Sequence, residues 1–208
     1  MTDLNFLSKD NCKMSYTPKI LAFAGSLRRD SLNKKVVRVA AEGARHAGAE
    51  VTLVDLKDFP MPIYDADQHE AEGFAEHANR FQQLLLAHDG LLISSPEYNG
   101  SLPGGMKNAI DWASRVNGEI KLGAAFKGKV GGIMTASPGS FGGIRCLGHL
   151  RSVLSILLVH VLPEEFAVTF AGEAFDDAGN FKDAKMQHLI ERHGANVAET
   201  IRKLKANN

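Results

Sequence analysis

Cysteine is scarce in this sequence, and neither sign of charge is in excess. Among the 208 residues, Cys12 and Cys146 stand far apart and form no Cys-x-x-Cys spacing. This scarcity argues against a disulfide scaffold or a cysteine zinc site, and it predicts a reducing, cytoplasmic location. Because 24 Lys and Arg balance 24 Asp and Glu, no overall field attracts nucleic acid or a membrane surface, and neither is expected as a partner.

Long apolar runs, a leader segment and a metal motif are also missing. No stretch approaches the roughly eighteen consecutive apolar residues that a membrane-spanning helix needs. His69 and His77 lack the H-E-x-x-H spacing, so we expect them at solvated helix positions and predict no metal site. Residues 1–17 lack the apolar block of a secretory signal. They are predicted to form an irregular extension before one domain that spans 18–208.

Short apolar runs alternate with amphipathic segments along the rest of the chain. The runs predict strands at 19–26, 49–56, 90–100 (stopped by Pro96), 129–137 and 159–170, and the amphipathic segments predict helices at 31–47, 73–88, 103–115, 142–158 and 182–205. Pro60 and Pro62 exclude an ordinary helix over 59–67. Since strands that alternate with helices require crossover connections, we predict a doubly wound α/β fold with a parallel sheet covered on both faces.

Anion-binding side chains follow the first predicted strand, at the beginning of a helix. In such sheets ligands bind beyond the carboxyl ends of the strands. Unpaired backbone N–H groups and the helix dipole already favour an anion there. The donors are Ser26, Arg28, Arg29, Ser31 and Asn33. They predict a phosphate cradle, whereas the alternative is that Asp30 or Ser31 only caps the helix while the arginines are solvated.

The kind of phosphate follows from motifs that this loop lacks. Gly25 is its only glycine, so neither the dinucleotide fingerprint G-x-G-x-x-G nor the P-loop is present. Side-chain hydroxyls in place of glycines suit a terminal monophosphate, which favours FMN over NAD. Asp55, at the end of the second predicted strand, keeps a dinucleotide-binding dehydrogenase open as an alternative.

The stretch SPEYNGSLPGGMKNAIDW, at 95–112, is the most specific pattern in the sequence. Tyr98 offers an aromatic plane, and Asn99 with the glycines after it permits backbone donors close to a flat ligand. The stretch therefore predicts a wall for an aromatic ring. Lys107 lies in the first turn of the predicted helix, where a cation opposes the helix dipole, so it is expected either to be exposed, which we favour, or to face a reduced, anionic flavin. Three side chains are expected to anchor the helix to the sheet: Asn108, Asp111 and Trp112.

A glycine-rich stretch, SPGSFGG at 137–143, follows the fourth predicted strand. Its glycines again allow close approach of the backbone to a ligand, although the stretch alone is a weak signal. Cys146 lies in the apolar helix after it. We expect this cysteine to be packed rather than reactive, since nothing near it in the sequence indicates a reactive thiolate.

Four stretches, in this order, resemble one known family. GSLRRDSLN, DFPMPIYDAD, SPEYNGSLPGGMKNAIDW and SPGSFGG are similar to NAD(P)H-dependent FMN reductases, a flavodoxin-like family that includes quinone, azo-dye and chromate reductases. The resemblance implies a three-layer α/β/α domain with five parallel strands in the order 2-1-3-4-5. It also implies the residues around FMN: Ser26, Arg28, Ser31 and Asn33 at the phosphate, Pro96, Glu97, Tyr98 and Asn99 along the isoalloxazine, and Ser137 with Gly139 at its other edge.

The resulting hypothesis is a reductase in which hydride passes from NADPH or NADH to bound FMN, and electrons then pass to a small-molecule acceptor. Backbone N–H groups would stabilise the reduced flavin, so no catalytic side chain is predicted. Two alternatives stay open. One is a flavodoxin-type electron carrier reduced by a partner protein, although such carriers tend to be acidic and this chain is neutral. The other is a nucleotide-binding sensory module without turnover.

The helix predicted at 142–158 is apolar around much of its circumference. Its apolar side chains are Ile144, Leu147, Leu150, Leu154, Leu157 and Leu158, more than one buried stripe requires. A subunit interface would cover the remainder, and the resemblance also implies a homodimer or homotetramer. The sequence leaves open the physiological acceptor and the choice between NADH and NADPH, for which Arg28, Arg29 and Arg115 are all candidates.

Overall fold

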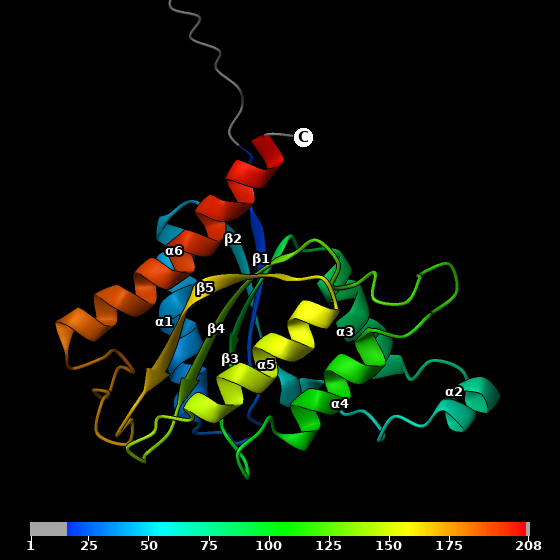
Figure 1. Ribbon diagram of the computed structural model, residues 1–208, viewed down its shortest axis with the longest axis horizontal. Coiled ribbons are helices and arrows are strands. Elements are labelled where there is room, and N and C mark those ends of the chain that lie inside the picture. The colour runs from blue at the N-terminus through cyan, green and yellow to red at the C-terminus, as the bar shows by residue number, and fades with distance from the viewer. Residues whose placement is uncertain (1–15, 207–208) are drawn as a thin grey trace, which may run out of the picture.

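The computed structural model describes residues 16–206, and five parallel strands form the centre of this part of the chain (Figure 1). The strands are β1 (Lys19–Ala24), β2 (Glu50–Asp55), β3 (Gly90–Ser94), β4 (Val130–Ala136) and β5 (His160–Val168). Their order across the sheet is β2-β1-β3-β4-β5, and every neighbouring pair is parallel. The predicted doubly wound α/β fold and its strand order are confirmed.

Helices cover both faces of this sheet. They are α1 (Leu32–His46), α2 (Ala66–Glu72), α3 (Glu76–Leu86), α4 (Gly104–Ala113), α5 (Ile144–Ile156) and α6 (Ala184–Ala206). Figure 1 shows α1 and α6 on one face and α3, α4 and α5 on the other, which makes three layers. Because side chains alternate along a strand, β1 serves both cores. Ile20 packs with α1 and α6, and Phe23 packs with α3 and α4.

Two glycines set the close approach of α1 and α6. A Cβ at Gly43 would lie 1.9 Å from the carbonyl oxygen of Glu191, and a Cβ at Gly194 would lie 1.8 Å from that of Ala40. Any side chain at either position would push the two helices apart. This contact explains why glycine occupies helix interiors here despite its low helix propensity.

The connection between β2 and α3 differs from the expectation. A 3-10 turn, η1 (Leu56–Asp58), follows β2, and residues 66–72 form α2. Asp65 caps α2 by accepting hydrogen bonds from the N–H groups of Asp67 and Gln68. The sequence pattern did not reveal α2 because the helix has no buried residue and therefore no apolar stripe. Gly73, with a φ of 85°, ends it and delays the beginning of α3 to Glu76.

Two properties of residues 16–206 concern membranes and metals. None of their helices is both long and apolar enough to cross a bilayer, and their side chains form no cluster of three or more potential metal ligands. Cys12 and almost all of the predicted extension at 1–17 lie outside the described residues. The boundary between that extension and the domain therefore stays a prediction.

Candidate functional site

The loops that follow β1, β3 and β4 meet at one edge of the sheet. Ala24 lies opposite Ser94, and Ser94 lies opposite Met134 in the parallel register. The three loops therefore leave the sheet side by side at its carboxyl edge, where α/β proteins bind ligands. They enclose a cradle of about 120 Å³, which eight of the ten predicted site residues line: Ser26, Arg28, Ser31, Asn33, Pro96, Glu97, Tyr98 and Ser137.

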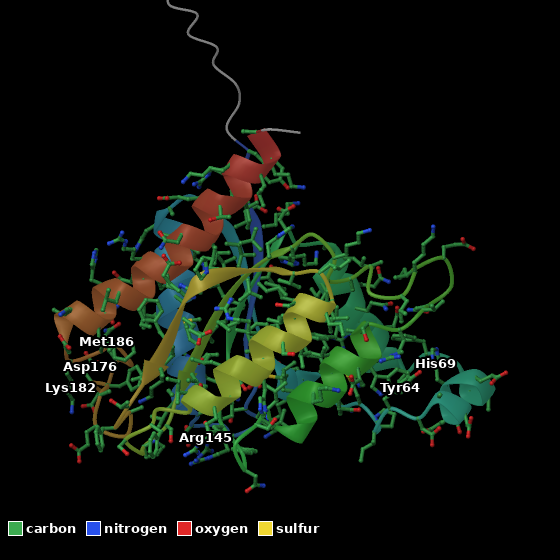
Figure 2. The ribbon with its side chains drawn as sticks, viewed as in Figure 1. Tyr64, His69, Arg145, Asp176, Lys182 and Met186 are labelled. Atoms are coloured by element: carbon green, nitrogen blue, oxygen red, sulfur yellow. The ribbon has the colours of Figure 1, made fainter. Side chains whose placement is uncertain are left out.

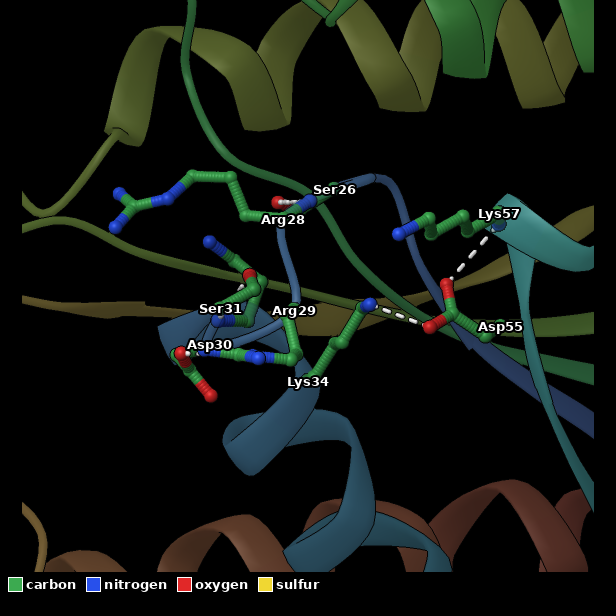
Figure 3. A network of polar contacts seen from close by, with 9 residues as sticks. Ser26, Arg28, Arg29, Asp30, Ser31, Lys34, Asp55 and Lys57 are labelled. Carbon is green, nitrogen blue, oxygen red and sulfur yellow. Dashed lines mark hydrogen bonds and ion pairs between the residues drawn. The ribbon is translucent and has the colours of Figure 1, made fainter.

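The first loop places two hydroxyl groups where α1 begins (Figure 3). Ser31 caps the helix, and its side-chain oxygen accepts a hydrogen bond from the N–H of Asn33 at 3.2 Å. Ser26 is buried and accepts from the N–H of Arg28 at 3.3 Å. Each hydroxyl oxygen accepts a backbone hydrogen and keeps its own hydrogen for a further acceptor. Both hydroxyls lie at the positive end of the α1 dipole, where they can bind an anion.

Arg28 and Arg29 are neighbours with different surroundings. Arg29 forms an ion pair with Asp30 at 3.3 Å, and both side chains are well exposed to solvent. Arg28 lines the cradle, and its guanidinium has no hydrogen-bond or ion-pair partner among residues 16–206. Figure 3 shows the Arg28 side chain extending away from Asp30. Of the two arginines, Arg28 is therefore the one available to an anion in the cradle.

Asn33 uses its amide inside the protein. Its Oδ1 accepts hydrogen bonds from the hydroxyl of Ser94 at 2.8 Å and from the N–H of Ala136 at 2.9 Å. Its Nδ2 donates to the carbonyl oxygen of Ala136 at 2.9 Å. The buried side chain thus ties the beginning of α1 to the ends of β3 and β4. Its contact with a phosphate stays a prediction, and its hydrogen bonds to Ser94 and Ala136 make Asn33 a positioning residue.

Asp55 is also engaged by its neighbours. Lys34 forms an ion pair with the Asp55 carboxylate at 2.5 Å, and the N–H of Lys57 donates to the same carboxylate at 3.0 Å (Figure 3). The second contact caps η1. This carboxylate holds the end of β2 in place, and such a role does not favour the dinucleotide alternative.

A two-residue turn shapes the loop after β3. Tyr98 and Ser101 exchange backbone hydrogen bonds at 3.0 Å and 3.1 Å. Asn99 and Gly100 between them both have positive φ, 52° and 78°, which is the conformation that an Asn-Gly hairpin turn adopts. The turn leaves the Tyr98 ring about half exposed beside the cradle. The stretch predicted to form an aromatic wall thus folds as a small hairpin, with Pro96 buried at its base.

Glu97 holds the N-terminus of α5. Its carboxylate accepts hydrogen bonds from the N–H groups of Arg145 at 3.0 Å and Cys146 at 3.3 Å. The Arg145 guanidinium forms an ion pair with the same carboxylate at 2.7 Å. Figure 2 labels Arg145 at this end of the molecule. Sequence reasoning missed the contact because 48 residues separate its partners, and no local pattern joins them.

The third loop contains two glycines that sterics require. Gly142 has a φ of 60°, and a Cβ there would lie 3.0 Å from the backbone of Val168. Gly143 has a φ of 92°, and a Cβ there would lie 2.3 Å from the Oγ1 of Thr135. Gly139 is different, since its φ is ordinary and an added Cβ would only touch the Ser137 hydroxyl at 3.7 Å. The N–H of Gly139 donates to that hydroxyl at 3.2 Å. Close approach of a ligand, rather than a clash within the protein, is what could demand glycine at position 139.

Asn108 and Trp112 bind a different segment from the one that the sequence predicted. Both side chains donate to the carbonyl oxygen of Pro62 at 2.8 Å, and Asn108 also accepts from the N–H of Tyr64 at 2.8 Å. They therefore anchor the proline-containing segment after η1 to α4, not α4 to the sheet. A proline segment makes no helix of its own, so its carbonyls need such partners. Asp111 pairs with the half-exposed Lys107 at 2.8 Å on the surface of α4.

His69 also lies elsewhere than expected. Its ring packs against Trp112 at 5.5 Å and against Phe74 at 5.3 Å, so it is half-buried rather than solvated. Tyr64 completes this aromatic cluster, 5.0 Å from Trp112 (Figure 2). The cluster fastens α2 to α4 and has no part in the cradle.

Cys146 is packed, as predicted. Its side chain is fully buried in the first turn of α5, and its Sγ lies 3.3 Å from the hydroxyl of Ser95. Burial raises the pKa of the Cys146 thiol, which keeps it protonated and unreactive at neutral pH.

Comparisons with known proteins agree with this geometry. Residues 18–173 match the family described as NADPH-dependent FMN reductase. The chain is 37% identical over 193 residues to an NAD(P)H-dependent FMN reductase of Pseudomonas aeruginosa, covering 92% of this chain and 100% of that protein. It is 41% identical over 186 residues to a 2-hydroxy-1,4-benzoquinone reductase of a Burkholderia species, covering 87% of this chain and 97% of that protein.

A solved structure shares both fold and part of the sequence. The flavoenzyme NAD(P)H:(acceptor) oxidoreductase FerB of Paracoccus denitrificans superposes with a TM-score of 0.76 at 28% identity, covering 90% of this chain and 98% of that one. The fold, the strand order and the matched sequence all indicate the same family. The chain belongs to the NADPH-dependent FMN reductase family of flavodoxin-like oxidoreductases.

Proposed function

We propose that this protein is an NAD(P)H-dependent reductase that binds FMN in the cradle and passes electrons to a small-molecule acceptor, with quinones as the first class to test. The observation that carries the proposal is the N-terminus of α1, where two hydroxyls and Arg28 adjoin the exposed ring of Tyr98. Relatives named as FMN and quinone reductases support the same activity.

The cradle fits the phosphate end of FMN. Its volume of about 120 Å³ suits a phosphate group and is too small for a three-ring flavin. Ser26, Arg28 and Ser31 would donate to the phosphate oxygens at the positive end of the α1 dipole. Asn33 would keep these donors in place through its bonds to Ser94 and Ala136.

The flavin ring would then extend along the Tyr98 hairpin. Pro96, Tyr98 and Asn99 form the wall, while Ser137 and Gly139 would close the other edge. Glu97 would contribute only its backbone, because its carboxylate is bound to Arg145 and to the N-terminus of α5.

Bound FMN supplies the chemistry, namely hydride acceptance from NADPH or NADH and electron transfer to the acceptor. The chain contributes orientation and hydrogen bonds from backbone N–H groups of the loops after β3 and β4, which favour negative charge on a ligand. The titratable side chains beside the cradle are occupied or protonated: Glu97 is paired, and Cys146 has a raised pKa. We therefore assign no catalytic side chain.

An absorption spectrum tests the proposal directly. The purified protein is mixed with FMN, freed of unbound flavin, and supplied with NADPH or NADH in the absence of oxygen. Flavin bands that remain with the protein and bleach on adding the nucleotide support the reductase. Bands that persist in its presence would instead indicate an electron carrier reduced by another protein. A protein that retains no flavin contradicts the proposed cofactor site.

A homodimer or homotetramer is a further part of the proposal. Leu147, Leu150 and Leu154 are buried in the core of the domain and so need no partner subunit. Ile144 and Ile156 remain exposed on α5, the latter by 82%, together with Leu158 just beyond the helix. This exposed set is the surface that an interface would cover. A monomeric mass in light scattering at micromolar concentration contradicts it. A cytoplasmic location, where NAD(P)H is available, completes the proposal.

A further inference from the structure

Two more cavities continue the cradle along the carboxyl edge of the sheet. The first, about 300 Å³, shares Arg28 and Tyr98 with the cradle and extends to the beginning of α4. The second, about 360 Å³, shares Leu27 and Gly105 with the first and extends to the segment after η1. A groove thus leads from the predicted flavin wall to Met61. Arg28 lines the first of these cavities and Lys57 the second, and Figure 3 shows the two side chains on opposite sides of Ser26.

The outer cavity is apolar in a way that the cradle is not. Its apolar lining consists of Leu27, Leu56, Phe59, Pro60, Met61 and Ala109. Of its two polar side chains, Asn108 is occupied by Pro62 and Tyr64, and Lys57 adds one charged group, held at its backbone N–H by Asp55. Apart from Lys57, such a lining offers burial to hydrocarbon.

Leu27 is the residue at which the two cavities join. Its side chain is 51% exposed and lines both cavities. Gly105 faces it from the second position of α4, where an added Cβ would lie 3.3 Å from the Leu27 Cδ1. The absence of a side chain at Gly105 keeps the connection open. An exposed leucine beside an open connection is what a ligand that crosses it would cover.

We propose that the groove from Tyr98 to Met61 binds the alkyl or isoprenoid side chain of a quinone whose ring is reduced beside Tyr98. The inference rests on the proposed function and adds a substrate class to it: quinones with an apolar tail are preferred over quinones without one. Continuity with the cradle places the groove beside the predicted redox centre, and its apolar lining selects hydrocarbon.

The test compares two acceptors that differ only in the tail: dimethoxy-methyl-benzoquinone and its decyl derivative. Since each buried methylene favours binding several-fold, partial burial of a decyl chain raises kcat/KM about tenfold or more. Met61→Gln places a polar amide in the outer cavity and removes most of this gain, with the tail-less quinone reduced as before. Ile63→Gln is the matched control, because Ile63 lies two residues away, is 85% exposed and does not line the groove.

Binding gives a second readout that needs no turnover. Isothermal titration of the FMN-loaded protein, without nicotinamide, measures the dissociation constants of both quinones. The wild-type protein and Ile63→Gln bind the decyl derivative at least several-fold more tightly than the tail-less quinone, and Met61→Gln shows a clearly smaller difference.

Three results overturn the inference. One is equal kcat/KM for both quinones in the wild-type protein, and another is a tail effect that Met61→Gln leaves unchanged. The third is displacement of the decyl quinone by adenosine 2′-phosphate, which assigns the groove to the nucleotide. Failure of the proposed function looks different, since the flavin would then not bleach with NADPH and neither quinone would be reduced.

Discussion

The N-termini of α1 and α5 point to the same edge of the sheet, but only that of α5 is bound by a carboxylate of the protein. At α5, the carboxylate of Glu97 accepts two backbone N–H groups and pairs with Arg145. At α1, the uncharged hydroxyl of Ser31 is the cap, and Arg28 adds positive charge. Both helix ends carry the same partial positive charge. One is neutralised by the protein itself, and the other is left to an external anion.

A helix N-terminus is therefore an anion site only where no carboxylate of the protein already occupies it. The open end at α1 depends on buried bonds behind it, because Asn33 fixes the first turn of the helix to β3 and β4. The closed end at α5 depends on a loop from elsewhere in the chain. Four substitutions test this difference, in order of decreasing expected effect.

Asn33→Ala removes the hydrogen bonds that fix the beginning of α1 to β3 and β4, and it has the largest effect. The Ser94 hydroxyl and both backbone groups of Ala136 lose a buried partner. The free energy of unfolding in urea therefore falls by ~3 kcal/mol. Asn196→Ala on α6 is the control, because its side chain is half-buried and makes no hydrogen bond to residues 16–206, so it changes stability by less than ~0.5 kcal/mol. Equal losses in both variants would refute the framing role of Asn33.

Arg28→Gln removes the charge at the open end. FMN affinity, measured by quenching of flavin fluorescence, falls about 10- to 100-fold, because a hydrogen bond to a charged group is lost. Arg29→Gln is a matched neighbour whose partner Asp30 lies in solvent, and it leaves affinity within about twofold. Stability in urea stays unchanged in both. A similar loss in the two variants would mean that general charge, not position, attracts the phosphate.

Glu97→Gln removes the negative charge that occupies the N-terminus of α5. The unfolding free energy falls by ~1 kcal/mol, since the amide keeps an acceptor but loses the charge that faces the α5 dipole and Arg145. In FMN-saturated protein, inorganic phosphate then stabilises this variant more than the wild-type protein. Glu165→Gln, which breaks the Arg151 pair away from the helix end, serves as the control. Thermal unfolding with and without phosphate measures the difference, and an identical phosphate effect in all three proteins contradicts the comparison.

Lys107→Gln concerns a cation near the beginning of α4 and has the smallest effect. Its ammonium pairs with Asp111 on the surface, at 2.8 Å, and does not line the cradle. FMN affinity and the rate of flavin bleaching by NADPH therefore stay within about twofold of wild type, and stability falls by no more than ~0.5 kcal/mol. A large change in bleaching rate would place Lys107 at the flavin after all.

The sequence predicted the parts of this molecule that are encoded locally. β1, β3 and β4 are nearly continuous apolar runs because both of their faces are buried, and such runs stand out in a sequence. The cap of α1 at Ser31, one of two candidates in the sequence, depends on neighbouring residues only. The Asn99–Gly100 turn is equally local, but it was not predicted. In contrast, α2 buries no residue and had no periodic signal.

The contacts that the sequence did not reveal join distant segments. Trp112 donates to Pro62, and Glu97 holds Arg145, across 50 and 48 residues respectively. The inward use of the Asn33 amide was missed for the same reason, since its partner Ala136 lies 103 residues away. A single sequence shows which hydrogen-bonding groups exist, but not which of them will be bonded inside the folded protein.

The doubly wound α/β fold, and the three loops that leave one edge of its sheet, follow from the sequence alone, because burial of apolar runs and local turn chemistry need no distant partner. Which hydrogen-bond donors remain free at that edge depends on the packing of the whole domain. Arg28 stays available while Glu97 and Asn33 are occupied, because pairing of a buried polar group is settled by whichever strand or helix the fold brings within hydrogen-bonding distance.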